Sequence, residues 1–146
     1  MLKSSLSLLG CHPNKPIKLI INSPGGDTLC GLALIDVMNN SQIPIHTICY
    51  GQALSMAFPI LISGHKRFAS KNAFMMYHEL WYSLKNQTLT NHINETKAGK
   101  NIMDIIHDII INKTKITHKQ LKQKQNKDWY INSKQALKLG IIDKII

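Results

Sequence analysis

The spacing of hydrophobic residues along the chain changes from a strand pattern to a helix pattern within the first forty residues. The short run Ile17–Asn22 is rich in branched apolar residues, which predicts a buried strand, and the Pro-Gly-Gly segment that follows predicts a turn. From Thr28 the apolar residues recur every three or four positions, which predicts a helix that Asp27 or Thr28 caps and that ends near Asn40. This part of the chain is therefore expected to form a strand, a tight turn and a helix.

The same order of patterns occurs a second time. Ile43–Tyr50 reads as another strand, Gly51–Leu54 as a turn, and Ser55–Ile62 as a mostly apolar helix. Two consecutive units of this kind predict an α/β fold with a parallel sheet and right-handed crossover connections.

A long amphipathic helix is predicted after two further short strands. Lys66–Ala69 and Ala73–Tyr77 have strand character, and Asn91–Lys113 has apolar residues at helical spacing. A helix as long and as apolar as this one needs a surface to pack against. Its stripe consists of Ile93, Ala98, Ile102, Ile105, Ile106, Ile109 and Ile110, widened by Met103 and Ile111.

The remaining residues are mostly polar and basic. The segment 113–127 contains six lysines and no acidic residue, which favours a solvated surface. A short helix is predicted from Ser133, as its N-cap, to Gly140, as its C-terminal stop, and a final strand at 141–146.

Composition narrows the class of protein. A chain of 146 residues is expected to be one domain, and its longest apolar stretch, from Ala53 to Ser63, is too short to span a bilayer and contains a proline. The net charge of +10 comes almost entirely from lysine, with Arg67 as the single arginine, so neither a nucleic-acid site nor a membrane partner is expected.

Three cysteines without a CxxC pair favour a reducing compartment, namely the cytoplasm or an organelle stroma or matrix. The first eleven residues imitate a lipoprotein signal, but serines interrupt their apolar run.

Ser55 is the first candidate for chemistry. It follows a strand and a glycine-containing turn and precedes an apolar helix, where a sharp turn exposes the hydroxyl beside the free amide of Met56. The segment lacks the flanking glycines of the esterase elbow, and the local pattern also fits a serine that simply caps a helix.

Three other features have both a chemical and a structural interpretation. Gly25 and Gly26 follow a strand and leave amides open to an oxyanion or a phosphate, but any tight turn needs such residues. His78 ends an apolar strand, where catalytic residues of α/β proteins collect, but it also fits a structural histidine. Asp128 stands among lysines and fits a solvated acid as well as a functional one.

Taken in order, five segments resemble the proteolytic subunit of the Clp protease, the caseinolytic serine peptidase family of the Clp/crotonase fold. The resemblance covers Pro16 to Ile146, so we expect one domain over residues 1–146 with a poorly matched segment at 1–15. The segments are Ile21–Gly26, Thr47–Ala57, Lys66–Phe68, Met75–His78 and Ser133–Lys144.

The resemblance implies a serine endopeptidase. It makes Ser55 the nucleophile, His78 the general base and Asp128 the orienting acid. The amides of Gly26 and Met56 would form the oxyanion hole, and the wall along the substrate backbone would consist of Glu79, Leu80 and Trp81. No metal or organic cofactor is implied, because the triad supplies base, nucleophile and oxyanion donors itself.

The resemblance also implies partners. Substrates would be peptides or unfolded proteins inside a homo-oligomeric ring that could include longer subunits. Residues 81–113 would form a handle through which two rings stack. An AAA+ unfoldase is a further expected partner. The family has an additional N-terminal segment that docks this ATPase, so we expect weak dependence on it here.

Some residues depart from the family pattern, and two alternatives remain open. The segment after His78 lacks the usual Gln-Pro and glycines, and Asn126 replaces an acid. The alternatives are a catalytically silent assembly or regulatory subunit and a crotonase-like acyl-CoA enzyme. Reaction with a serine-directed fluorophosphonate separates these alternatives from a peptidase.

Overall fold

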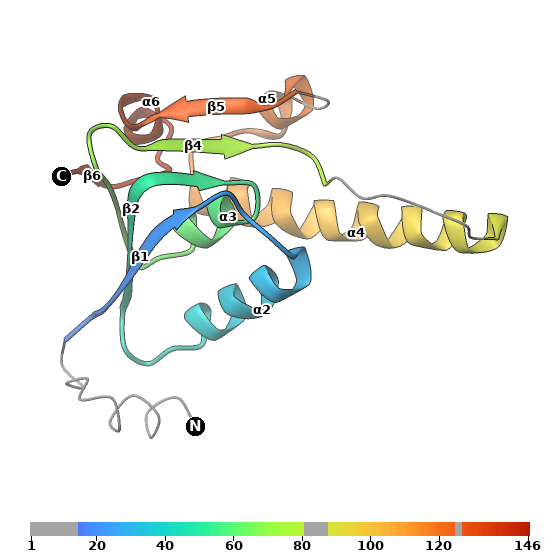
Figure 1. Ribbon diagram of the computed structural model, residues 1–146, viewed down its shortest axis with the longest axis horizontal. Helices are drawn as coiled ribbons and strands as arrows, with labels where there is room; N and C mark the ends of the chain where they lie inside the picture. Colours follow the sequence, from blue (N-terminus) through green and yellow to red (C-terminus); the bar gives the residue numbers. More distant parts are fainter. Residues whose placement is uncertain (1–14, 81–87, 125–126) are drawn as a thin grey trace.

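The computed structural model describes residues 15–80, 88–124 and 127–146, which form a six-stranded sheet with helices around it (Figure 1). The strands are β1 (Ile17–Ser23), β2 (Ile45–Leu54), β3 (Lys66–Ala69), β4 (Phe74–Tyr77), β5 (Trp129–Asn132) and β6 (Lys144–Ile145). The helices are α2 (Thr28–Asn39), α3 (Ala57–Ile62), α4 (Leu89–Lys113), α5 (His118–Gln123) and α6 (Ser133–Lys138). The expected α/β class with parallel strands is confirmed.

The long strand β2 organises the sheet. It pairs in parallel with β1 along one edge, and with β3 and then β4 along the other, while β5 joins β4 antiparallel. The change of partner coincides with Gly51, whose φ of 78° favours glycine and whose missing side chain leaves room for the Asn22 amide. The prediction of a turn at Gly51–Leu54 is wrong, because pairing with β4 keeps this segment extended.

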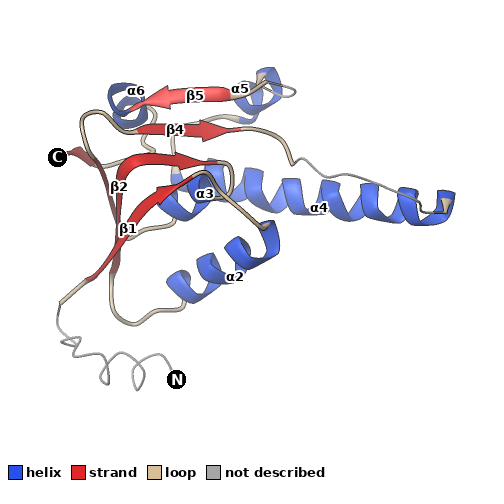
Figure 2. Cartoon of the chain, viewed as in Figure 1, coloured by secondary structure: helices blue, strands red, loops and turns tan. Residues whose placement is uncertain are grey.

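Helices α2, α3 and α4 pack beside the parallel strands. The side chain of Asp27 caps α2 by accepting a hydrogen bond of 2.8 Å from the Cys30 amide, which confirms one of the two predicted caps. Helix α3 contacts β2, α2 and α4 (Figure 2), and its Phe58 and Leu61 are fully buried. This arrangement places the main core between α3 and the sheet.

Helix α4 has two different halves. Its N-terminal end extends beyond the sheet (Figure 1), and Ile93 there is 47% exposed. Ile106 and Ile110 in its C-terminal half are buried in the domain's own core. We expected the apolar stripe of this helix to pack against another subunit. That expectation is wrong for Ile106 and Ile110, which pack into the core of their own domain.

The lysine-rich segment is more ordered than its composition predicts. It contains α5, which a capping box at Thr117 starts and which buries Leu121. Apolar periodicity does not reveal α5, because only one of its residues, Leu121, is buried and the buried Ile116 lies before the helix begins.

Two predictions near the C-terminus need correction. The N-cap of α6 is Asn132, whereas Ser133 is already helical and donates hydrogen bonds to the carbonyls of Ser70 (2.7 Å) and Ala73 (3.0 Å). The final strand is confined to β6, because the buried pair Ile141 and Ile142 lies in the bend that follows α6.

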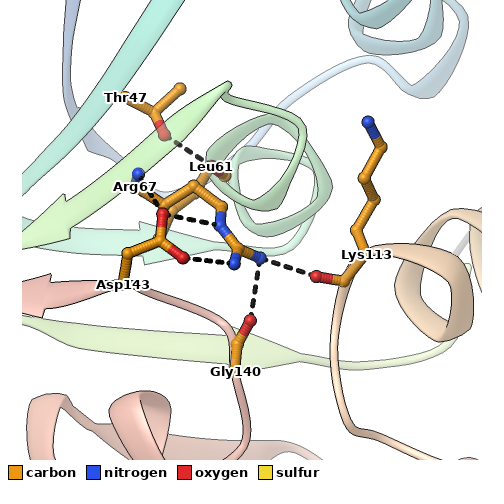
Figure 3. Close-up of polar contacts among 6 residues, drawn as sticks. All are labelled: Thr47, Leu61, Arg67, Lys113, Gly140 and Asp143. Carbon is orange, nitrogen blue, oxygen red and sulfur yellow. Dashed lines mark hydrogen bonds and ion pairs between the residues drawn. The ribbon is translucent and has the colours of Figure 1, made fainter.

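The single arginine joins three distant segments (Figure 3). Its guanidinium donates to both carboxylate oxygens of Asp143, at 2.6 and 3.2 Å, and to the carbonyls of Lys113 and Gly140, at 2.6 and 2.8 Å. Arg67 on β3 therefore holds the C-terminal end of α4 and the bend after α6 in place.

Two further observations concern the whole described chain. None of the described helices has the length and apolar character needed to cross a bilayer. Cys30 and Cys49 both carry free thiols.

Candidate active site

The strand register brings four predicted residues to one edge of the sheet. Ser23 at the end of β1 pairs with Ala53, and Leu54 at the end of β2 pairs with Met76 of β4. The segments that follow these three strands therefore emerge side by side, as expected for the carboxyl ends of parallel strands. Gly26, Ser55, Met56 and His78 all line the same cleft.

Ser55 forms a sharp elbow between β2 and α3. Its φ of 52° is unusual for a residue with a side chain and costs about 1 kcal/mol or more. The elbow is held by its amide, which donates to the Met76 carbonyl at 2.9 Å, and by its carbonyl, which accepts from the Phe58 amide at 3.0 Å. The N-cap position of α3 belongs to Met56, so the interpretation of Ser55 as a simple cap is wrong.

The hydroxyl of Ser55 contacts His78. Ser55 Oγ and His78 Nε2 lie 2.8 Å apart, and both residues are half-buried. This distance suits transfer of the hydroxyl proton to a neutral imidazole, which is the step that activates a serine nucleophile.

The glycine turn packs directly against this elbow. Gly25 has a φ of 106°, and a Cβ atom there would lie 2.6 Å from Ser55 Cβ and 2.8 Å from the Leu54 carbonyl oxygen. Within the described residues, the amides of Gly26 and Met56 donate no hydrogen bond, and both residues line the cleft. Two such amides beside a nucleophile can stabilise an oxyanion.

The cleft beside Ser55 has a volume of about 230 Å³. Glu79 and Leu80 are part of its wall, and the Leu80 amide donates to Met103 Sδ at 3.2 Å. Trp81, which we expected beside them, lies outside the described residues. The other lining residues are mostly apolar, namely Thr28, Pro59, Tyr77, Met103 and Ile106.

Asp128 lies close in the fold but without contact. Strand β5 pairs Trp129 with Tyr77 in antiparallel register, so Asp128, one residue earlier, lies across from His78, one residue later. Its side chain is exposed and has no hydrogen bond or ion pair with any described residue. The structure thus brings Ser55 and His78 together and leaves Asp128 at the rim.

Two residues beside the site were missed by sequence reasoning. Tyr77 was interpreted only as strand, yet its hydroxyl lies 2.7 Å from His107 Nε2 on α4. His107 was not singled out because it stands among the polar positions of a long helix. The available signal is a polar residue directly after the buried Ile106 and three positions before the buried Ile110.

Across the described part of the chain, no three histidine, cysteine or acidic side chains are close enough to hold a metal ion.

Comparison with known proteins identifies both a family and named relatives. A family model described as Clp protease matches residues 2–146. The chain is also 31% identical, over 137 residues, to a protein of Deinococcus radiodurans named ATP-dependent Clp protease proteolytic subunit. The alignment covers 92% of this chain and 67% of that protein.

Proposed function

The chain belongs to the Clp protease family and is a serine-type endopeptidase subunit, and we propose that its catalytic triad is Ser55, His78 and Asp128. The observation that carries this proposal is the 2.8 Å contact between Ser55 Oγ and His78 Nε2 in the cleft. The alternatives of a silent subunit and an acyl-CoA enzyme are not favoured by the family membership.

The proposed reaction is acyl transfer through Ser55. His78 accepts the hydroxyl proton while Ser55 Oγ attacks the peptide carbonyl, and the resulting imidazolium then protonates the leaving amine. Water, activated by the same imidazole, releases the acyl group and restores the hydroxyl. The amides of Gly26 and Met56 stabilise the oxyanion that forms in both steps.

Asp128 has the third role in this proposal. A carboxylate on His78 Nδ1 fixes the tautomer and stabilises the imidazolium. The antiparallel register places Asp128 across from His78, and its exposed side chain is able to change rotamer without breaking a contact to a described residue.

The cleft suggests how a peptide binds. Glu79 and Leu80 follow His78 and form one wall of the cleft, while Pro59, Met103 and Ile106 supply an apolar wall. We therefore assign unfolded chains or peptides as substrates, with an apolar side chain beside Ser55.

The decisive experiment compares three single variants with matched controls in hydrolysis of a short fluorogenic peptide. Ser55→Ala and Asp128→Asn are expected to lower kcat by about 10⁴-fold or more, as removal of a triad member does. His78→Gln is expected to do the same. The controls are Ser63→Ala at the other end of α3, Asp36→Asn on α2 and His92→Gln on α4, which leave turnover unchanged.

A serine-directed fluorophosphonate provides an independent readout. It is expected to label the wild-type chain at Ser55 and to leave Ser55→Ala unlabelled. Undiminished hydrolysis by Ser55→Ala would refute the triad, and undiminished hydrolysis by Asp128→Asn alone would remove Asp128 from it.

We also propose a homo-oligomeric assembly of two stacked rings, with the exposed half of α4 as a contact between the rings. Leu89 is 77% and Ile93 is 47% exposed on this half, and apolar residues at such positions gain by burial against another subunit. Ile93→Glu is expected to reduce the sedimentation coefficient, while Thr96→Glu on the same half serves as control. Ile106 is unsuitable for this test because it belongs to the core.

An AAA+ ATPase and longer subunits of the same kind are proposed partners, since the Deinococcus relative is named for ATP dependence. We place the protein in the cytoplasm or an organelle stroma or matrix, where free thiols such as Cys30 persist. Degradation of a folded tagged substrate, with and without unfoldase and ATP, tests the partnership.

A further inference from the structure

The segment that carries His78 is attached to α4 on both sides. The residue before it, Tyr77, has its hydroxyl 2.7 Å from His107 Nε2. Two residues after it, the Leu80 amide donates to Met103 Sδ at 3.2 Å. Met103 and His107 are one helical turn apart on α4, so one face of this helix holds both ends of the segment.

The contact between Tyr77 and His107 is partly buried, and Tyr77 is its buried member. Tyr77 is 2% exposed, and its ring centroid lies 6.0 Å from that of His107 at an angle of 51°. Burial, reinforced by the charge of Glu79, raises the pKa of Tyr77 to about 12, so the hydroxyl stays protonated and keeps its hydrogen bond. This hydrogen bond is costly to break, because the hydroxyl of the buried Tyr77 then lacks a partner.

His78 has few other constraints in the described structure. Its Nε2 faces Ser55, and its Nδ1 has no hydrogen-bond partner among the described residues. In the described structure the direction of the imidazole therefore depends on its contact with Ser55 and on the backbone of the segment Tyr77–Leu80, which the two attachments to α4 hold in place.

We infer that Tyr77 and His107 form a positioning pair that holds His78 in line with the Ser55 hydroxyl. Neither residue takes part in bond making. Their hydrogen bond fixes the end of β4 against α4, and thereby fixes the distance over which the proton moves from Ser55 Oγ to His78 Nε2. The inference rests on the proposed roles of Ser55 and His78.

The consequence is a defect in turnover rather than in binding. A shift of about 1 Å in a catalytic group can reduce the rate by up to about 100-fold. Loss of the pair is expected to move His78 by less than this, because Leu80 remains attached to Met103. We expect kcat to fall about tenfold. KM is expected to change less than twofold, because Tyr77→Phe keeps the ring that lines the cleft and His107 is not among the lining residues.

The experiment uses four variants of the full chain: Tyr77→Phe, His107→Leu, His107→Gln and the Tyr77→Phe/His107→Leu double variant. Tyr77→Phe and His107→Leu are each expected to show the tenfold loss in kcat and a matching loss in the rate of fluorophosphonate labelling. The double variant is expected to be no worse than either single variant, because both remove one hydrogen bond. His107→Gln keeps a side-chain partner for the Tyr77 hydroxyl and is expected to recover most of kcat.

The matched control is Tyr50→Phe, at an exposed position on β2. A fall in Tm with an unchanged kcat in Tyr77→Phe would show that the pair is only structural and would overturn the inference. Equal losses in His107→Gln and His107→Leu, or additive losses in the double variant, would do so too. If His107→Leu does not fold, Tyr77→Phe decides the matter, since it removes a single oxygen atom.

These outcomes are separable from failure of the proposed function. A wild-type chain that neither hydrolyses peptide nor reacts with fluorophosphonate contradicts the roles of Ser55 and His78. An active wild-type chain with unaffected Tyr77 and His107 variants contradicts the positioning pair alone.

Discussion

Replacement of Arg67 by methionine is expected to destabilise the fold strongly. The guanidinium makes two hydrogen bonds with the Asp143 carboxylate and two with main-chain carbonyls, those of Lys113 and Gly140 (Figure 3). Methionine preserves the apolar stem and removes all four. The C-terminal end of α4 and the bend after α6 would then lose their common partner on β3.

The size of the expected destabilisation follows from the solvent exposure of the Arg67 and Asp143 side chains. The Asp143 side chain is 42% exposed and that of Arg67 15%, so solvent screening limits the ion pair to at most about 1 kcal/mol. Each hydrogen bond from the charged guanidinium to a carbonyl contributes about 1 kcal/mol. The expected loss in the free energy of unfolding is therefore about 3 kcal/mol, a large fraction of the 5–15 kcal/mol typical of a domain.

Urea unfolding measures this loss. All variants are compared at the same protein concentration, so that any contribution from subunit association is the same in each. Lys66→Met is the control, because it removes the same charge from the neighbouring exposed position on β3, and it is expected to change stability by less than about 0.5 kcal/mol. Asp143→Asn is expected to cost about 1 kcal/mol, since the carbonyl contacts of Arg67 remain. An Arg67→Met loss below about 1 kcal/mol, or one equal to that of Lys66→Met, would refute the reasoning.

Three further predictions concern the active-site edge, pH and helix capping. Gly25→Ala is expected to reduce turnover at least about 100-fold, because a Cβ 2.6 Å from Ser55 Cβ must displace the elbow. The control Gly140→Ala is expected to affect only stability. Equal turnover in the two variants would contradict this prediction. Burial lowers the pKa of His107 despite the opposing charges of Asp104, Glu79 and Asp108, with His118 adding to the lowering. The unfolded chain then binds the proton more readily, so the free energy of unfolding is expected to fall as pH drops from about 7 through the ordinary histidine pKa of about 6.5. In urea titrations, His107→Gln is expected to make the free energy of unfolding depend less on pH in this range. Asn132→Ala removes the capping box of α6 and is expected to cost about 1 kcal/mol in thermal unfolding, while no change would show that packing alone holds the helix.

Local sequence patterns were sufficient to predict most helices and strands of the N-terminal half. The branched run of β1, the Asp27 cap of α2 and the apolar α3 each follow from periods and capping preferences that act over a few residues. The same reasoning placed Ser55 at an elbow and glycines beside it, since a tight turn before a helix has a recognisable composition. The resemblance then supplied the roles of His78 and Asp128, which no local pattern distinguishes from structural residues.

Long-range pairing decided what the sequence pattern could not. The segment after Gly51 is a strand because β4, more than twenty residues later in the chain, pairs with it. Ile106 faces the core and Ile93 does not, although both lie on the same periodic stripe, because only one half of α4 meets the rest of the domain. Neither outcome is encoded in a window of neighbouring residues.

The same holds for the active site. Apolar periodicity and turn chemistry predicted which residue types stand at the strand ends, but the distance from Ser55 to His78 depends on the register of β2 with β4. The contact of Tyr77 with His107 joins residues 30 positions apart and depends on the packing of α4. Hydrogen bonds are short and directional, so such contacts are determined only when the tertiary structure fixes both partners.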